Sequence, residues 1–318
     1  STAPALNPLL ATFAAGVLGG TAPVQARLAF SGPLAPPAGL DTLAWLSRLD
    51  SHDTAIGYGS FSHSGFVIVG PPLPVRLAKG VFALDYACTV NGGATALKVA
   101  ASLPKERADV SVTTTDLQLS NDLAWLVAYL NPIFKLEEHG TLTGFAALAT
   151  TAAWRGSFTP VDLRPALGAS LDAKGRFSAS RVSITGSKLL LAAINALSDG
   201  AADSLVEVLP TDFTVQRGVV AYRDMLVRVG GLTLTFSGTA NIVTDALDMT
   251  LSAPFPKRGG DKLAKYLPAT LVLPIRGTIS QPIYDFKVAL AAAFREAAEK
   301  AARAAVKDGL LDGLLKKL

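Results

Sequence analysis

Apolar and polar residues alternate with a period of two over many short stretches of the chain. The stretches 232–237 (LTLTFS) and 247–252 (LDMTLS) show this pattern most clearly. Because successive side chains of a strand point to opposite faces of a sheet, the pattern predicts strands with one apolar face and one wet face. The glycine pairs Gly92-Gly93 and Gly230-Gly231 indicate tight turns between neighbouring strands. Such short connections predict a mostly antiparallel sheet.

Helical patterns are much rarer, with about four or five helices expected beside about 14 to 16 strands. The ranges 41–48 and 121–129 begin with a capping residue and carry apolar residues at helical spacing. The longest predicted helix spans 286–318 and is rich in alanine. We expect it to cap one end of the sheet, because its apolar face is weak; binding to a membrane surface is the alternative.

Four short motifs recur in the same order in both halves of the chain, which predicts a duplicated unit. The last three recur about 137 to 140 residues apart, and a helical insertion near 188–209 is expected in the second copy. The four pairs are GSFSHSGFVI at 59–68 with GRFSASRVSI at 175–184, KGVFA at 79–83 with RGVVA at 217–221, DLA at 122–124 with DKLA at 261–264, and GTLT at 140–143 with GTIS at 277–280.

These patterns divide the chain into four parts. Residues 1–58 are an N-terminal segment with a partial repeat end and a helix, 59–145 the first β unit, 146–285 the second β unit and 286–318 the C-terminal helix. The predicted fold is mainly β with a few helices. Its curved antiparallel sheet, built from two duplicated units, is expected to form a taco-like or partly open barrel groove.

The composition narrows the classes of function. Half of the 318 residues are hydrophobic and 17% are charged, against about 25% in an average soluble protein, which excludes a disordered chain. Cys88 is the only cysteine, so a disulfide scaffold is excluded and a Cys/His zinc site is disfavoured. The net charge of +4 gives no indication of nucleic-acid binding. Residues 1–26 are uncharged, but Asn7, Pro8 and the Gly19-Gly20 pair argue against a membrane span there.

Side-chain patterns typical of enzymes are missing. His63 lies between Ser62 and Ser64, but neighbours on a strand point to opposite faces, so we interpret it as a solvated strand histidine. Glu137-Glu138-His139 is interpreted as a polar loop rather than a metal site, because no further ligands lie nearby. No GxGxxG, Walker A, HExxH or GxSxG motif is present. We therefore expect no enzyme activity, no cofactor and no metal.

The apolar strand face is the more informative feature. With so few helices to cover it, the sheet must either close on its own side chains or hold an apolar ligand in an open groove. Periodicity does not separate these two alternatives. The expected groove lining comprises ten apolar residues of the alternating stretches, namely Leu97, Val99, Val110, Val112, Leu232, Leu234, Phe236, Leu247, Met249 and Leu251.

The motifs of residues 140–318 follow an order that resembles the C-terminal region of AsmA-like proteins. They run from FTVQRGV at 213–219, after the helical insertion, through GTANI at 238–242 and LDM at 247–249 to LPIRGTISQP at 273–282 and a final helix. The first half of the chain matches more loosely. These motifs are turns and strand ends, so they specify a fold better than a function.

The resemblance implies a protein of the bacterial cell envelope, usually with an N-terminal membrane anchor and a periplasmic body. Relatives of the family include long repeating-β-groove proteins that are thought to conduct phospholipids between membranes along an apolar inner sheet face. This chain is short and shows no recognisable anchor. Bridging an envelope would therefore require a longer parent chain or end-to-end assembly.

We therefore expect a non-enzymatic lipid-handling domain that shields acyl chains in its groove, as part of inter-membrane lipid transport or envelope maintenance. The expected partners are a phospholipid or other acyl lipid and a membrane or envelope protein, with no nucleic acid. The alternative is a structural or assembly module for outer-membrane biogenesis, with a closed core and an exposed sheet edge. An enzyme acting on lipid or glycan is the third hypothesis.

Overall fold

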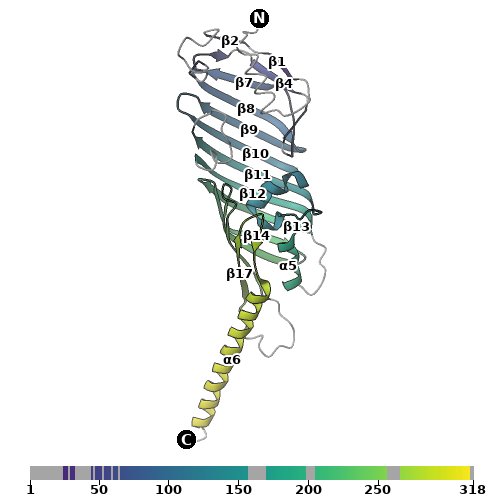
Figure 1. Cartoon of the computed structure of the whole chain (residues 1–318), viewed down its shortest axis with the longest axis vertical. Helices are drawn as coiled ribbons and strands as arrows, with labels where there is room; N and C mark the ends of the chain where they lie inside the picture. The colour runs from purple at the N-terminus through teal and green to yellow at the C-terminus, as the bar shows by residue number, and fades with distance from the viewer. Residues whose placement is uncertain are drawn as a thin grey trace.

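A computed structural model of the chain describes residues 24–27, 29–32, 44–45, 47–51, 54–58, 60–63, 65–156, 170–197, 205–255 and 266–315. This part forms a long, curved antiparallel sheet that is not closed into a barrel (Figure 1). The first strands lie at one end of the molecule, and a C-terminal helix projects from the other. The predicted mainly β fold, with a curved antiparallel sheet and a terminal helix, is confirmed.

Neighbours in the sheet are mostly neighbours in the sequence. The order of its path is β1-β4-β7 and then β8 to β18 in succession, while the β5–β6 hairpin pairs beside β8 and β2 pairs with β3 separately. The strands are β1 (Val24–Arg27), β2 (Phe30–Ser31), β3 (Asp50–Ser51), β4 (Thr54–Tyr58), β5 (Ser60–His63), β6 (Phe66–Val69), β7 (Leu73–Ala78), β8 (Val81–Val90), β9 (Gly93–Ser102), β10 (Arg107–Leu119), β11 (Thr141–Arg155), β12 (Leu171–Thr185), β13 (Leu205–Gln216), β14 (Val219–Val229), β15 (Leu232–Asn241), β16 (Leu247–Pro254), β17 (Thr270–Gly277) and β18 (Pro282–Ile283). The helices are α3 (Ala124–Leu130), α5 (Lys188–Leu197) and α6 (Phe286–Leu315), with single 3-10 turns η1 (Asn121–Leu123) and η2 (Pro132–Phe134).

Two-residue turns set the register of the hairpins. Lys79-Gly80 between β7 and β8 has φ angles of 50° and 73°, and Arg217-Gly218 between β13 and β14 has 49° and 75°. Positive φ at both positions is what a turn matching the twist of antiparallel strands requires. The motif pair KGVFA and RGVVA therefore occupies equivalent hairpins, as the repeat predicts.

Other motif pairs are not equivalent. Residues 59–68 span the β5–β6 hairpin, whereas 175–184 lie inside the single strand β12. The backbone is left-handed at the matching positions Gly65 (φ 86°) and Arg181 (φ 50°), but it makes a tight turn at the first and a bulge at the second. GTLT begins β11, whereas GTIS follows from the end of β17. Residues 261–264, which carry the DKLA motif, lie outside the described residues.

The expected boundaries between units also differ from the structure. The boundary between 145 and 146 falls inside β11, so the sheet continues through it. Of the insertion expected near 188–209, residues 188–197 form α5, but 205–209 belong to β13. The sequence from 205 onwards alternates apolar and polar positions, which is the period of a strand and not of a helix.

A series of β-bulges bends strands β10 to β15. Asp116, Arg181 and Asp224 have φ angles of 54°, 50° and 53° and lie at register shifts of β10, β12 and β14. Gly144 lies at the shift between β11 and β12, where an added Cβ would approach the Cα of Val182 to 2.7 Å. Bulges increase the local twist and bend the bulged strand, so the sheet curves around whatever fills its inner side.

Residues 121–134, which are part of the connection between β10 and β11, pack into the C-terminal half of the curved sheet, and we call them the plug. The side-chain amide of Asn121 holds the plug in place, because it donates to the carbonyl of Gly140 (3.1 Å) and accepts from the backbone N–H of Leu142 (2.7 Å). The hydroxyl of Tyr129 donates to Asp245 (2.9 Å) in the connection between β15 and β16. The plug is thus anchored at the start of β11 and at the connection between β15 and β16, which lie in different halves of the chain.

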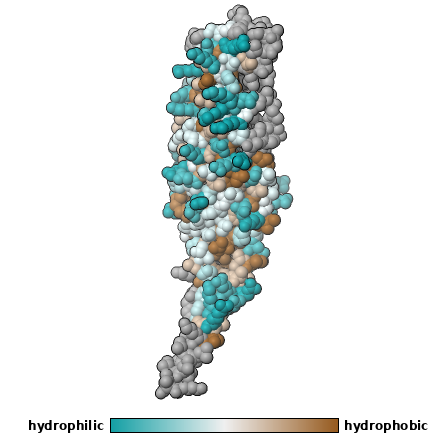
Figure 2. Space-filling model, turned by 90° about the vertical axis from the view of Figure 1, so that its left-hand side faces the viewer, coloured by the Kyte–Doolittle hydropathy of each residue, from teal (hydrophilic) through white to brown (hydrophobic). Residues whose placement is uncertain are grey.

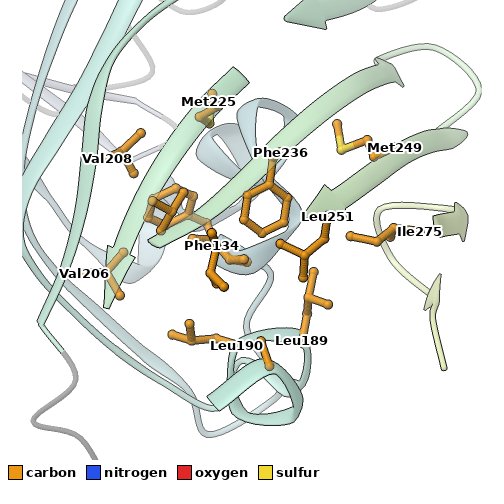
Figure 3. Packing of buried hydrophobic residues seen from close by; sticks show 14 of the residues in the cluster. Phe134, Leu189, Leu190, Val206, Val208, Met225, Phe236, Met249, Leu251 and Ile275 are labelled. Carbon is orange, nitrogen blue, oxygen red and sulfur yellow. The ribbon is translucent and has the colours of Figure 1, made fainter. Parts of the chain in front are cut away.

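The inner face of the C-terminal half is a closed hydrophobic core (Figure 3). Ile133 and Phe134 of the plug are fully buried in it. Helix α5 adds a stripe of buried residues at helical spacing, and the hydroxyl of Ser187 accepts a hydrogen bond from the backbone N–H of Leu190 (3.3 Å) in its first turn. Sheet residues complete the core from the other side, and those labelled in Figure 3 include Val206, Val208, Met225, Phe236, Met249, Leu251 and Ile275.

Helix α6 begins on the core and then leaves it. Phe286 and Ala293 are buried, and the ring of Phe294 meets that of Phe255 edge-on at 5.6 Å between ring centres. Beyond this contact the helix extends away from the sheet (Figure 1). The prediction of a long C-terminal helix from 286 is confirmed, and its first turns pack against the end of the sheet as a cap would.

The wet face of the sheet carries cross-strand ion pairs. Arg176 on β12 binds both carboxylate oxygens of its register partner Asp212 on β13 at 2.7 and 2.9 Å, which lowers the pKa of that carboxyl. Lys98 on β9 and its register partner Asp85 on β8 form a further ion pair, with 3.3 Å between Nζ and Oδ2. Figure 2 shows one long side of the molecule, where hydrophilic side chains dominate the upper part and hydrophobic ones form only small patches.

Candidate ligand-binding cavity

The inner face of the N-terminal half holds an apolar cavity of about 500 Å³. Seven strands (β4, β6 to β11) and one side chain of α3, Leu126, form its wall. Among the described residues, the helical cover of this half is confined to its N-terminal end, where Trp45, in the helical pair 44–45, is buried against Leu77 and Phe82. The apolar side chains that line the cavity are Ile56, Phe66, Ile68, Leu73, Leu84, Tyr86, Val90, Leu97, Val112, Leu117, Leu126 and Leu148.

The alternating pattern of the strands produces this lining. On β8 the inward side chains are Leu84, Tyr86, Cys88 and Val90, and Leu97 on β9 is the register partner of Tyr86. On β10, Val112 is the register partner of Leu97, and on β11, Thr150 is the partner of Val112. Side chains in register on antiparallel strands share one face, so these residues form continuous rows across the sheet.

The hydroxyl groups in the wall bind to other protein groups. The hydroxyl of Tyr86 donates to the carbonyl of Pro71 (2.7 Å), and that of Thr150 donates to the carbonyl of Lys174 (3.0 Å). The hydroxyls of Thr95 and Thr114 are hydrogen-bonded to each other at 2.8 Å. A cavity holds ordered water when it offers polar groups that need partners. The hydroxyl groups of this wall are already hydrogen-bonded to protein groups, so they do not require water as a partner. An apolar occupant is therefore favoured.

Among the residues that the structure describes, no charged side chain lines the cavity. Burying an unpaired charge in such a wall would be costly, and an ionic ligand would find no counter-charge there. Burying a methylene group in an apolar environment, by contrast, stabilises a complex by about 0.8 kcal/mol. A wall of this chemistry is a more favourable environment for apolar groups than for ionic ones.

Cys88, the only cysteine of the chain, lines the wall. Partial burial raises the pKa of its thiol above the ordinary value, because the apolar surroundings disfavour the charged thiolate. The thiol is thus less reactive than a free one at neutral pH. Because it lines the cavity, its rate of chemical modification depends on how accessible the cavity is to the reagent.

The structure separates the ten expected groove residues into two groups. Leu97 and Val112 line the apolar cavity, and Val99 and Val110 lie on the same inner face two residues further along their strands. Val99 also packs beside Leu84 and Tyr86. Two of the four first-half residues therefore line the cavity, and the other two extend its face.

The six second-half residues do not line an open groove. Leu234, Phe236, Leu247, Met249 and Leu251 are between 0% and 4% exposed, and Leu232 is partly buried against the same core. The expectation is wrong for them because the plug, α5 and the start of α6 fill this half with side chains. Alternation identified their face correctly but gave no information on what covers it.

Several cavity residues were not among the expected ones. Tyr86 and Cys88 alternate with exposed residues on β8, so a period-two signal was available for them. Leu126 was not predictable in this way, since its place depends on the plug folding back under the sheet. Ile56, Phe66 and Leu73 lie on short strands at the N-terminal end, where the pattern is brief.

The remaining candidate residues are His63 and the run Glu137-Glu138-His139. His63 ends β5 opposite Phe66. Glu137, Glu138 and His139 are exposed, and Glu137 pairs with Lys188 at 2.9 Å. The described residues contain no group of three or more His, Cys, Asp or Glu side chains able to hold a metal ion.

A second hollow, of about 640 Å³, lies across β9 to β13. Its sides are two rows of mostly exposed residues that include Lys98, Asp109, Asp172 and Lys174. These side chains alternate with Val99 and Ala173 of the inner face, so the hollow lies on the wet face of the sheet. It is a charged depression and does not continue the apolar cavity.

Comparison with known proteins gives no further guide. No protein-family model, no curated protein and no solved structure matches this chain. In the part of the chain that the structure describes, no helix has both the length and the apolarity that a membrane crossing needs.

Proposed function

We propose that this chain is a non-enzymatic lipid-handling domain that shields acyl chains from water in the apolar cavity. The observation that carries the proposal is the cavity wall, whose described residues are mostly apolar, include no charged side chain and have their hydroxyl groups hydrogen-bonded within the protein. Transfer of methylene groups from water to such a wall is favourable at about 0.8 kcal/mol each. The mechanism is passive binding and release.

The resemblance of residues 140–318 to AsmA-like proteins supports a place in the bacterial cell envelope. We propose a periplasmic domain of a membrane-anchored protein that acts in lipid transport between membranes or in envelope maintenance. Its partners in this proposal are a phospholipid or another acyl lipid and a membrane or envelope protein.

The second candidate is a structural or assembly module for outer-membrane biogenesis. The closed core of the C-terminal half favours it, because that core needs no ligand. At the end of the sheet, β17 pairs with β18 over two residues only, which leaves an edge of the kind that binds partner strands. The apolar cavity is the feature that this candidate does not account for.

Alkylation of Cys88 tests the proposed function directly. Iodoacetamide reacts with the thiolate, and burial raises the thiol pKa, so half of the maximal rate is expected at a pH above about 8.5, the value of a free thiol. At a fixed alkaline pH, adding phospholipid vesicles is expected to slow the reaction further, because an acyl chain in the cavity covers the sulfur.

A matched variant controls for effects outside the cavity. Cys88→Ser combined with Ala87→Cys moves the thiol to the adjacent exposed position on the other face of β8. Its alkylation rate is expected to be unchanged by vesicles. Equal rates with and without lipid at Cys88 itself, in folded protein, would refute lipid binding in the cavity.

A further inference from the structure

The apolar cavity stops abruptly at β12. The register partner of Leu148 on β12 is Phe177, which is 2% exposed and part of the closed core. The partner of Thr150 is Gly175, where an added Cβ would meet the ring of Phe213 at 2.8 Å. The Phe213 ring thus lies over the inner face at this point. Phe177 and Phe213, with Leu126 on α3, form an end wall.

The volume of the cavity is that of one hydrocarbon chain. A methylene group is close in size to a water molecule, whose share of liquid volume is about 30 Å³. About 500 Å³ therefore accommodates roughly 16 such groups. Two acyl chains of ordinary length would need about twice this space.

The shape of the cavity supports the same conclusion. Its wall runs from Ile56 on β4 to Thr150 on β11, across five gaps between strands, which is about 24 Å at the usual strand spacing. The volume spread over this length gives a channel roughly 5 Å wide. This width is that of a single extended chain and is about half the 10 to 12 Å diameter of an α-helix with its side chains.

We infer that the apolar cavity is a blind pocket for one acyl chain of about 16 carbons, so that the domain carries single chains and does not conduct lipid along the whole sheet. This inference rests on the proposed function and adds its capacity and direction. A diacyl lipid would insert one of its chains. A single-chain amphiphile, such as a fatty acid or a lysophospholipid, would insert its only chain.

Chain-length dependence of binding tests the inference. Saturated fatty acids and lysophospholipids of about 8 to 20 carbons compete with a fluorescent fatty acid for the full chain, each below the concentration at which it aggregates. Affinity is expected to rise about fourfold with every methylene, until about 16 carbons fill the pocket, and then to level off. A plateau in either series supports the pocket. The series that shows it tells whether the bound acyl chain belongs to a fatty acid or to a lysophospholipid.

The outcomes separate this inference from the proposed function. If affinity keeps rising up to about 20 carbons at the same increment, the end wall is not a barrier and the inference is wrong, while the proposed function stands. If no chain of any length binds to folded protein, the proposed function fails as well.

A pair of variants tests the position of the end wall. Leu126→Trp enlarges the α3 side chain that lines the cavity, so the plateau is expected at a shorter chain with unchanged binding of the shortest ligands. Leu191→Trp places the same ring on an exposed position of α5 (53% exposed) and is expected to leave the plateau unchanged. A Leu126→Trp plateau identical to that of the unmodified chain would contradict an end wall at α3.

Discussion

Leu97→Asp is expected to abolish binding of acyl ligands while the protein still folds. Leu97 lies in the middle of the apolar cavity, between Tyr86 on β8 and Val112 on β10. A carboxylate there would be buried by the bound chain without a partner, since none of the described residues that line the wall is a cation. We expect a cost of at least about 3 kcal/mol, which is more than a hundredfold loss in affinity.

The matched control is Ala96→Asp, on the adjacent residue of the same strand. Ala96 is exposed on the wet face, so the new charge is solvated and affinity is expected to stay within about twofold of the unmodified chain. Circular dichroism and the urea midpoint of both variants show whether they fold. Full lipid binding by folded Leu97→Asp would rule out the cavity as the binding site.

Phe236→Ala is expected to destabilise the protein by about 3 to 5 kcal/mol. The ring of Phe236 is fully buried in the core among Phe134, Leu251 and other apolar side chains, so its removal leaves a cavity that this closely packed half fills only in part. The midpoint of urea unfolding is expected to fall accordingly. Affinity for acyl chains at low temperature, where the variant remains folded, is expected to be unchanged.

Trp125→Ala provides the comparison for a large aromatic outside the core. Trp125 is on α3 but 54% exposed, so its loss is expected to change the free energy of unfolding by only about 0.5 kcal/mol. Substitutions in the C-terminal half are thus expected to change the free energy of unfolding, whereas substitutions in the N-terminal half are expected to change the affinity for lipid. If Phe236→Ala left the urea midpoint unchanged but removed lipid binding, the groove would extend through the second half.

The sequence predicted the faces of the strands well, because the period of a strand is fixed by backbone geometry. Leu97 and Phe236 were both assigned to the apolar inner face, and both lie there. Which part of that face is covered depends on long-range packing, and alternation carries no information on it. Phe236 is covered because the plug folds back under the C-terminal half and brings Phe134 against it.

The helices show the same limit. The pattern at 121–129 predicted a helix, and the structure has η1 and α3 there, yet nothing local indicated that this segment closes the core on one side and lines the cavity with Leu126 on the other. The apolar stripe of α5 was a usable signal, since five of its ten residues are buried at helical spacing. Interpreting it as an insertion overlooked that such a stripe needs a surface to pack on.

The division of the sheet into a filled half and a hollow half reconciles the two hypotheses that the sequence left open. A closed core gives the fold its stability, and the plug that completes the core also ends the cavity. The domain proposed here therefore carries a folding core and a binding cavity on one sheet, and strands β10 and β11 contribute residues to both.

Lipid extraction and mass spectrometry of the full chain, purified without detergent, test the central claim most directly. We predict co-purifying acyl lipid in an amount close to one molecule per chain, with much less in Leu97→Asp and an unchanged amount in Ala96→Asp. A folded, lipid-free protein that also takes up no lipid from vesicles would contradict the claim.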